Sequence, residues 1–140
     1  MLMRCAVRYY SRGGNTERVA RAIAGELETD AYTTDTPLKE YADVLLVGSG
    51  MYAGHIDPHV KQFLEELDPK KTGKVAFFAT SMTSGKKLDR EVREILDRKG
   101  IPMEEETFHC RGRFLIFHIS RPNRLDLRAA RQFADRYREE

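Results

Sequence analysis

Residues 44–47 read Val-Leu-Leu-Val, an uninterrupted apolar run between Asp43 and Gly48. A strand that is apolar at every position has to bury both of its faces, as a central strand does in a parallel sheet covered on both sides. Segments typical of strands alternate with amphipathic helical segments along the whole chain, which is the pattern of an α/β protein. The sequence therefore predicts a three-layer α/β fold with helices on both faces of a parallel sheet.

Five strands and four helices can be placed along the 140 residues. We expect strands at residues 4–10, 30–34, 42–48, 74–80 and 103–110. We expect helices at 16–28, from the Asp57-Pro58 pair onward, at 87–99 and at 124–138. This spacing suits a doubly wound sheet with the strand order 2-1-3-4-5, in one domain that covers residues 1–140. Ligands of such sheets bind beyond the carboxyl ends of the strands, where the strand order reverses between strands one and three.

The first strand runs into a turn rich in glycine and hydroxyl groups, and a helix follows at once. Residues 11–16 of this turn read Ser-Arg-Gly-Gly-Asn-Thr. The unpaired N–H groups and the positive dipole end of a helix that begins here form an anion site. Gly13 and Gly14 allow close backbone approach, Ser11, Asn15 and Thr16 add donors, and either Asn15 or Thr16 could cap the helix. The implied ligand is a phosphate monoester.

The order of hydroxyls and glycines distinguishes this turn from other phosphate loops. It is neither a dinucleotide Gly-x-Gly-x-x-Gly turn nor a P-loop. It resembles the phosphate loop of flavodoxins, a Ser/Thr-x-Ser/Thr-Gly-x-Thr turn that holds the phosphate of FMN. Ser11, Gly14 and Thr16 match that pattern, and Asn15 is a common occupant of the variable place. The resemblance implies the flavodoxin-like fold and FMN as the cofactor.

Two residues of the turn depart from the flavodoxin pattern. Gly13 stands where a hydroxyl is expected, so one side-chain hydrogen bond to the phosphate is missing. Arg12 is a charged residue that could offset this loss, although flavodoxins usually avoid a charge there. We therefore include Arg12 and Gly13 with the predicted cofactor-binding residues.

The turn that follows the third strand reads Gly-Ser-Gly-Met-Tyr-Ala-Gly-His over residues 48–55. In flavodoxins the corresponding turn lies against the flavin ring, usually with an aromatic side chain stacked on it. The resemblance implies that Met51 and Tyr52 are ring neighbours, and that Ser49 and Gly50 make backbone contacts beside Ala53. The alternative is a flexible turn whose tyrosine packs on the next helix.

Two further turns fall at the same edge of the predicted sheet. After the fourth strand, Ser81, Met82 and Thr83 could offer backbone N–H groups to the polar edge of a flavin. This turn lacks the aromatic residue with which flavodoxins often cover the second ring face, which suggests a more open ring. After the fifth strand, Cys110 and Gly112 would allow close approach to the ring, or they simply end the strand.

Charge is distributed unevenly along the chain. The net charge is +2, and the residues from 111 onward hold eight arginines against four acids. Electron-carrier flavodoxins are usually strongly acidic, so a basic end could steer acidic partners or an anionic membrane surface. The more ordinary explanation of these arginines is a solvated helix face. The apolar run from Phe114 to Ile119 could make a weak membrane or quinone contact, and no recognised nucleic-acid motif accompanies the arginines.

The resemblance implies an FMN protein that transfers electrons between redox partners. An alternative is a flavin-dependent oxidoreductase acting on a quinone or porphyrinogen, because residues 48–64 are similar to flavodoxin-type protoporphyrinogen oxidases. A third is a flavodoxin-like binding module that has lost FMN. We predict no catalytic residue and no metal site, since a helix start separates His55 from His59. Two unpatterned cysteines and the lack of a signal peptide predict a cytoplasmic location.

Overall fold

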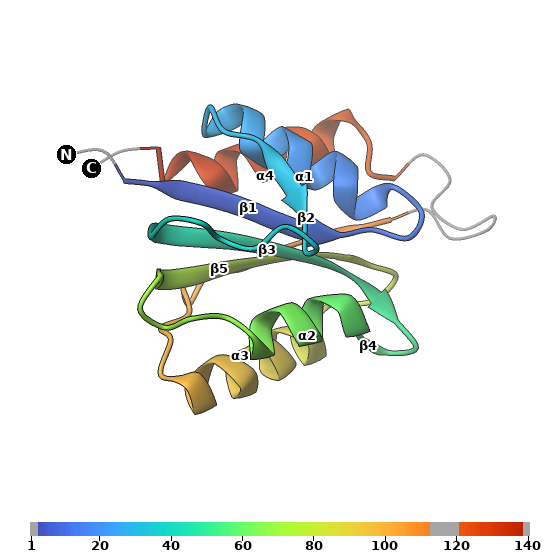
Figure 1. The fold of residues 1–140 in the computed structure, drawn as a ribbon. Coiled ribbons are helices and arrows are strands. Elements are labelled where there is room, and N and C mark those ends of the chain that lie inside the picture. Colours follow the sequence, from blue (N-terminus) through green and yellow to red (C-terminus); the bar gives the residue numbers. More distant parts are fainter. Residues whose placement is uncertain (1–2, 113–120, 139–140) are drawn as a thin grey trace.

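The computed structural model describes residues 3–112 and 121–138. Its strands are β1 (Cys5–Tyr10), β2 (Ala31–Thr33), β3 (Ala42–Tyr52), β4 (His55–Ile56), β5 (Thr72–Ser81) and β6 (Phe108–Arg111). Its helices are α1 (Asn15–Glu26), α2 (Pro58–Glu65), α3 (Lys86–Lys99) and α4 (Arg124–Asp135). The sheet lies between two helical layers, with α1 and α4 on one face and α2 and α3 on the other (Figure 1).

The strand order is β2-β1-β3-β5-β6, and the short β4 pairs only with β3. All neighbours along this order run parallel, whereas β3 and β4 are antiparallel. With β4 set aside, this is the predicted doubly wound order, and the flavodoxin-like fold is confirmed. Among the described residues, no helix is long and apolar enough to cross a membrane.

Both faces of β3 are buried, as the apolar run predicts. Leu45 and Val47 belong to a core cluster with residues of α2 and α3, whereas Val44 and Leu46 belong to a second cluster with residues of α1 and α4. All four side chains are 0 % exposed. The central strand is thus the point at which two separate apolar layers meet.

The prediction that a turn begins at Gly48 is wrong. β3 continues in register with β5 as far as Gly50. Its last two residues pair with the antiparallel strand β4, Met51 with Ile56 and Tyr52 with His55. The two residues of the turn, Ala53 and Gly54, have φ values of 50° and 82°. Positive φ at both central positions matches the right-handed twist of the flanking strands in a two-residue hairpin. Residues 51–56 therefore form a β-hairpin and not an irregular turn.

The last strand is shorter than predicted. β6 covers only Phe108–Arg111, and Met103 makes an isolated bridge to Val75. The Glu104 N–H still donates to the Val75 carbonyl at 2.8 Å, and the acidic side chains pair with nearby cations: Glu104 lies 3.6 Å from Lys74, and Glu106 lies 2.6 Å from Arg136.

Two predicted helix boundaries are confirmed by their caps. The side chain of Asp57 accepts a hydrogen bond from the His59 N–H at the start of α2, with Pro58 at the first helical position. Gly100 ends α3 in the left-handed conformation, with φ at 72°. These are the arrangements that favour aspartate before a helix and glycine after one.

Gly48 allows the side chain of Phe78 to lie directly against the backbone of β3. A Cβ atom at this position would stand 2.2 Å from a ring carbon of Phe78, which is itself fully buried. We expect Gly48→Ala to lower the free energy of unfolding by about 1–3 kcal/mol, the usual cost of overpacking a core. Urea unfolding measures this difference.

The matched control is Gly25→Ala on the exposed side of α1, where a Cβ atom would meet nothing within 4 Å. This substitution should raise the free energy of unfolding by about 0.5–1 kcal/mol, because alanine loses less backbone entropy than glycine in a helix. Equal effects at the two positions would contradict the close approach at Gly48.

Candidate functional site

A cavity of about 570 Å³ lies at the carboxyl ends of β1, β3 and β5, the edge that the strand order predicts. Its size is typical of a small-molecule pocket. It is lined by Tyr10, Ser11, Arg12, Gly13, Asn15, Thr16, Gly50, Met51, Tyr52, Ala53, Gly54, Asp57, Thr80, Ser81, Met82 and Gly112. The structure thus brings residues of the three predicted turns and the start of α1 to one cavity.

The start of α1 at this cavity is not capped by any side chain. The N-cap residue is Gly14, with φ at 93°, so the prediction that Asn15 or Thr16 caps the helix is wrong. Both residues belong to the helix, because the turn bends one position earlier, where only glycine adopts positive φ without strain. The hydroxyl of Ser11 accepts a hydrogen bond from the Gly14 N–H at 3.0 Å and so fixes the turn.

Thr16 joins the helix start to the end of β5. Its side chain is 1 % exposed, and its hydroxyl lies 2.7 Å from that of Thr80. Gly50 packs beside this pair, since a Cβ atom there would be 3.4 Å from the Thr16 hydroxyl. One hydroxyl hydrogen is used between the two threonines, which leaves the other available to a ligand in the cavity.

Asp57 is the most densely bonded side chain of the site. It is 3 % exposed, and its carboxylate accepts hydrogen bonds from Arg12 Nε at 2.7 Å and from the backbone and ring N–H groups of His59, both at 2.9 Å. Burial by itself would raise the pKa of Asp57, but the hydrogen bonds from His59 and Arg12 outweigh it and hold the pKa below its ordinary value. The carboxylate is therefore ionised at neutral pH.

Ser49 lies in β3, next to the lining residue Gly50. It is fully buried, and its hydroxyl donates to the Gly50 carbonyl at 2.6 Å and accepts from the Asp57 N–H at 3.0 Å. Its hydroxyl is thus engaged in joining β3 to the start of α2. The predicted backbone contact of Ser49 with a cofactor stays a prediction.

Arg12 lies across the aromatic side chains of the pocket. Its guanidinium carbon is 4.1 Å from the ring centre of Tyr52 and 5.6 Å from that of Tyr10, in addition to its bonds with Asp57. Tyr52 keeps 46 % of its surface exposed. A flat ligand ring would have to take the place of the guanidinium in order to stack on this face of Tyr52.

The turn after β5 is held by its own hydrogen bonds. Ser81 donates its hydroxyl hydrogen to the Thr83 carbonyl at 2.6 Å, and the Thr83 hydroxyl lies 3.9 Å from the sulfur of Met51. Ser81 and Met82 line the cavity, and Met82 is 38 % exposed. Thr83 is exposed and does not line the cavity, but it contacts two residues that do, Ser81 and Met51.

The end of β6 comes close to Asn15 at the start of α1. A Cβ atom at Gly112 would stand 2.7 Å from the side-chain nitrogen of Asn15, so only glycine fits there without a shift. Cys110 does not line the cavity, and burial, with a contribution from Asp126, raises the pKa of its thiol to about 12. Its thiol is protonated at neutral pH, which is the opposite of a reactive cysteine.

Four lining residues, Tyr10, Gly54, Asp57 and Thr80, were not among the sequence predictions for the site. The sequence could have indicated a place in the site for Tyr10 and Thr80, because each has a polar end and lies at the carboxyl end of a predicted strand. Asp57 was interpreted only as a helix cap, and no local pattern indicates its pairing with Arg12, which is 45 residues away. The apolar run from Phe114 to Ile119 lies outside the described residues.

The flavodoxin domain model matches residues 6–119, which include all of β1 to β6 except Cys5, the first residue of β1. The chain belongs to the flavodoxin family. The uncharacterized protein MJ0298 of Methanocaldococcus jannaschii is 33 % identical over 133 residues, covering 86 % of this flavodoxin-domain chain and 87 % of the relative.

Solved flavodoxins share the fold of this chain at low sequence identity. A flavodoxin from the domain Archaea superposes with a TM-score of 0.78 at 17 % identity, covering 97 % of this chain and 96 % of its own. Flavodoxin 1 from Bacillus cereus gives a TM-score of 0.71 at 20 % identity, covering 96 % of each chain. These two likenesses show the fold of this flavodoxin-family protein.

Asp57 should make the stability of the protein depend on pH in the acid range. Because its pKa is lowered in the folded protein, its contribution is present above the ordinary carboxyl pKa of 3.8 and is lost as the pH falls through the lowered value. We expect Asp57→Asn to reduce the free energy of unfolding at pH 7 by about 1–3 kcal/mol, the usual worth of hydrogen bonds to a charged group. Urea unfolding at neutral and acid pH measures this.

The difference between Asp57→Asn and the original protein should shrink on acidification, since asparagine still caps the helix but does not titrate. Asp135→Asn on the exposed side of α4 serves as the control, with an expected change within about 0.5 kcal/mol. A difference that stays constant from neutral to acid pH would contradict the assigned role of the carboxylate.

Proposed function

We propose that this flavodoxin-family protein binds FMN in the described cavity and transfers electrons between redox partners. The observation that carries the proposal is the uncapped start of α1, which shares one cavity with the half-exposed ring of Tyr52. An anion site and an aromatic side chain that line the same pocket suit a ligand that carries both a phosphate and a flat ring.

The phosphate end is provided by the turn at residues 11–16. In the proposal, Gly14 lets the backbone come close, and the positive end of α1 stabilises the dianion. The second hydrogen of the Thr16–Thr80 hydroxyl pair supplies a donor that the missing hydroxyl at position 13 does not. The turn at residues 11–16, together with Thr80, therefore fits a phosphate monoester.

The ring end is provided by the hairpin of β3 and β4. Tyr52 is the aromatic platform, and the thioethers of Met51 and Met82 are soft apolar neighbours. When bound, FMN supplies the capacity to accept one or two electrons, and the protein controls this through ring contacts, charge and water exclusion.

The titratable pair in the cavity supports electron transfer over proton chemistry. Asp57 is held ionised, and the pKa of Arg12 is raised further by its hydrogen bond to Asp57. Neither group is therefore set to exchange a proton near neutral pH. We propose a cytoplasmic location, in keeping with the two free cysteines, Cys5 and Cys110.

A flavin-dependent oxidoreductase acting on a quinone or porphyrinogen is the second candidate. It is favoured by the exposed apolar surface at the cavity, where Met82 is 38 % and Tyr52 46 % exposed. Rapid reoxidation of the reduced protein by a soluble quinone, with no protein partner present, would favour this enzyme over the carrier.

The hypothesis that the turn at residues 11–16 binds the phosphate of FMN is tested by titrating the flavin-free protein with FMN and with riboflavin. The titration follows flavin fluorescence. We expect FMN to bind about 100-fold more tightly than riboflavin, which corresponds to about 2.7 kcal/mol for the phosphate. Equal binding of both, or binding of neither, would contradict the proposal and leave a flavodoxin-like binding module.

Thr16→Val tests whether the preference for FMN over riboflavin comes from the turn at residues 11–16. The substitution keeps the side-chain shape and removes the hydroxyl, so FMN affinity should fall about tenfold while riboflavin affinity stays unchanged. The control is Thr72→Val at the opposite end of β5, where the hydroxyl bonds the Asp68 carbonyl. That variant should alter stability and leave the affinity for FMN as it is.

Arg12 should act on the ring end of the site. Because its guanidinium lies on Tyr52, Arg12→Gln removes a group that a ring has to displace, and FMN and riboflavin should both bind about fivefold more tightly, close to the worth of one cation–π contact. Fluorescence titration of both flavins gives the comparison.

The two roles considered for Arg12 give different results in this experiment. A guanidinium that held the phosphate would lower FMN affinity alone when it is removed, and this outcome would overturn the covering role. Arg21→Gln, which breaks an exposed pair with Glu17 on α1, is the control and should change neither affinity.

A further inference from the structure

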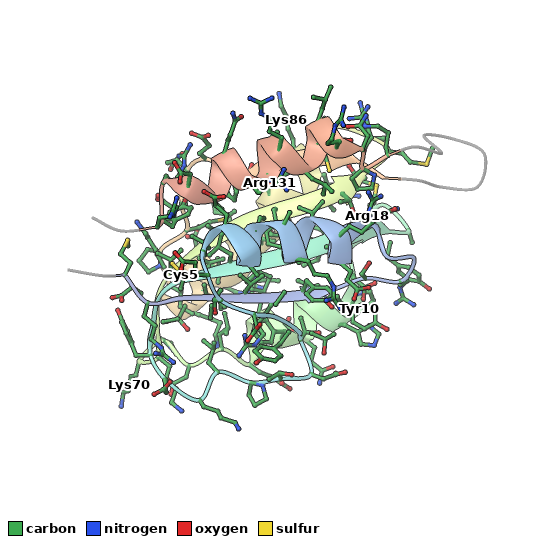
Figure 2. The ribbon with its side chains drawn as sticks, turned by 90° about the horizontal axis from the view of Figure 1, so that it is seen from above. Cys5, Tyr10, Arg18, Lys70, Lys86 and Arg131 are labelled. Atoms are coloured by element: carbon green, nitrogen blue, oxygen red, sulfur yellow. The ribbon has the colours of Figure 1, made fainter. Side chains whose placement is uncertain are left out.

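The first turns of α1 and the segment from Arg121 to Arg131 form a strongly basic surface, called here the basic face. It carries six arginines against two acids, which makes a net charge of +4 on a chain whose total is +2. The arginines are Arg18, Arg21, Arg121, Arg124, Arg128 and Arg131, and the acids are Glu17 and Asp126. In Figure 2, α1 and α4 lie side by side with Arg18 and Arg131 on the surface seen from above.

Both acids of the basic face are already engaged. Glu17 accepts from Arg21 at 2.7 Å, and Asp126 accepts from Arg121 at 2.6 Å while it completes the capping box of α4 with Asn123. The other four arginines, at positions 18, 124, 128 and 131, form no ion pair with any described residue. Arg18 acts on Asp126 only from a distance, as one of the charges that lower the pKa of that carboxyl.

The basic face begins at the rim of the cavity. Asn15 lines the cavity, and Arg18 follows it by one turn of α1. At the start of α4, Leu125 is 68 % exposed among the arginines, although it is a large apolar side chain. Arginines around an exposed apolar residue are the composition of a protein-binding surface.

We propose that the basic face docks a small acidic electron-transfer protein, in an orientation that brings it to the cavity rim. This inference rests on the proposed function and names the partner class for it. The carboxylates of a folded acidic protein match guanidinium groups in bidentate pairs, and a surface charge of +4 speeds their encounter. The sign of this surface charge is the reverse of that in electron-carrier flavodoxins, which are usually strongly acidic.

An acidic protein fits this surface better than an anionic membrane does. Membrane-surface helices place several apolar side chains beside their cations, whereas Leu125 is the one strongly exposed large apolar residue of α1 and α4 in the described part of the chain. The other apolar residues of α4, such as Phe133 and Ala134, are buried against the sheet.

The test measures binding of a plant-type [2Fe–2S] ferredoxin, a strongly acidic one-electron protein, by fluorescence anisotropy. Flavin-free and FMN-loaded protein are both titrated, from about 20 to about 200 mM salt. We expect the affinity to fall at least about tenfold over this range, and Arg124→Glu with Arg128→Glu to weaken binding about tenfold at low salt. Stopped-flow electron transfer to the loaded protein should slow by the same factor.

The matched control is Arg90→Glu with Arg98→Glu on α3, which makes the same change of charge on the opposite face of the sheet at two exposed arginines. Measured at the same salt concentration as the basic-face variant, it should weaken binding less than about twofold. Equal loss in the two double variants would overturn the docking face, because the attraction would then follow net charge alone.

Two further outcomes would also overturn the proposal. One is tighter binding of basic cytochrome c than of ferredoxin. The other is binding of phosphatidylserine vesicles that depends on Arg124 and Arg128 while ferredoxin binding does not. Since ferredoxin binding to the flavin-free protein does not require FMN, failure of docking is distinguishable from failure of the proposed function, which the flavin titration reports separately.

Discussion

The buried carboxylate of Asp57 is the interaction on which the candidate site depends. It joins the loop after β1, through Arg12, to the start of α2, through the His59 N–H, and the backbone N–H of Asp57 adds a bond to the Ser49 hydroxyl of β3. A buried charge without partners is costly, but here donors from a guanidinium, a backbone amide and an imidazole compensate for the lost water. The guanidinium of Arg12, paired with this carboxylate, also covers one face of the Tyr52 ring.

The sheet gives this network a fixed frame. Because β3 is buried on both faces and Gly48 lets Phe78 lie against it, the carboxyl ends of β1, β3 and β5 are held at one edge. The pocket and the basic face share that edge, because α1 begins at the pocket and its first turns form part of the basic face. Electron transfer at the pocket and recognition of a partner beside it are consistent roles for a family member whose surface charge is positive.

Much of the fold could be predicted from local patterns. The apolar run at residues 44–47, the Asp57-Pro58 helix start and the glycine after α3 each act within a few residues of themselves, and each prediction was confirmed. Contacts over longer distances were missed. No local signal shows that residues 51–56 pair as a hairpin, that Gly14 takes the cap position, or that the acids before β6 pair with Lys74 and Arg136.

The sequence by itself determined the layered α/β architecture and the glycine- and hydroxyl-rich turn at residues 11–16, because strand period, burial pattern and helix signals are properties of neighbouring residues. Only the tertiary structure decided how that turn is used. Arg12 is drawn to Asp57, 45 residues away, and Thr16 to Thr80, 64 residues away. These pairings exist because folding brings the ends of separate strands to one edge, where buried polar groups must find partners among whatever the fold places there.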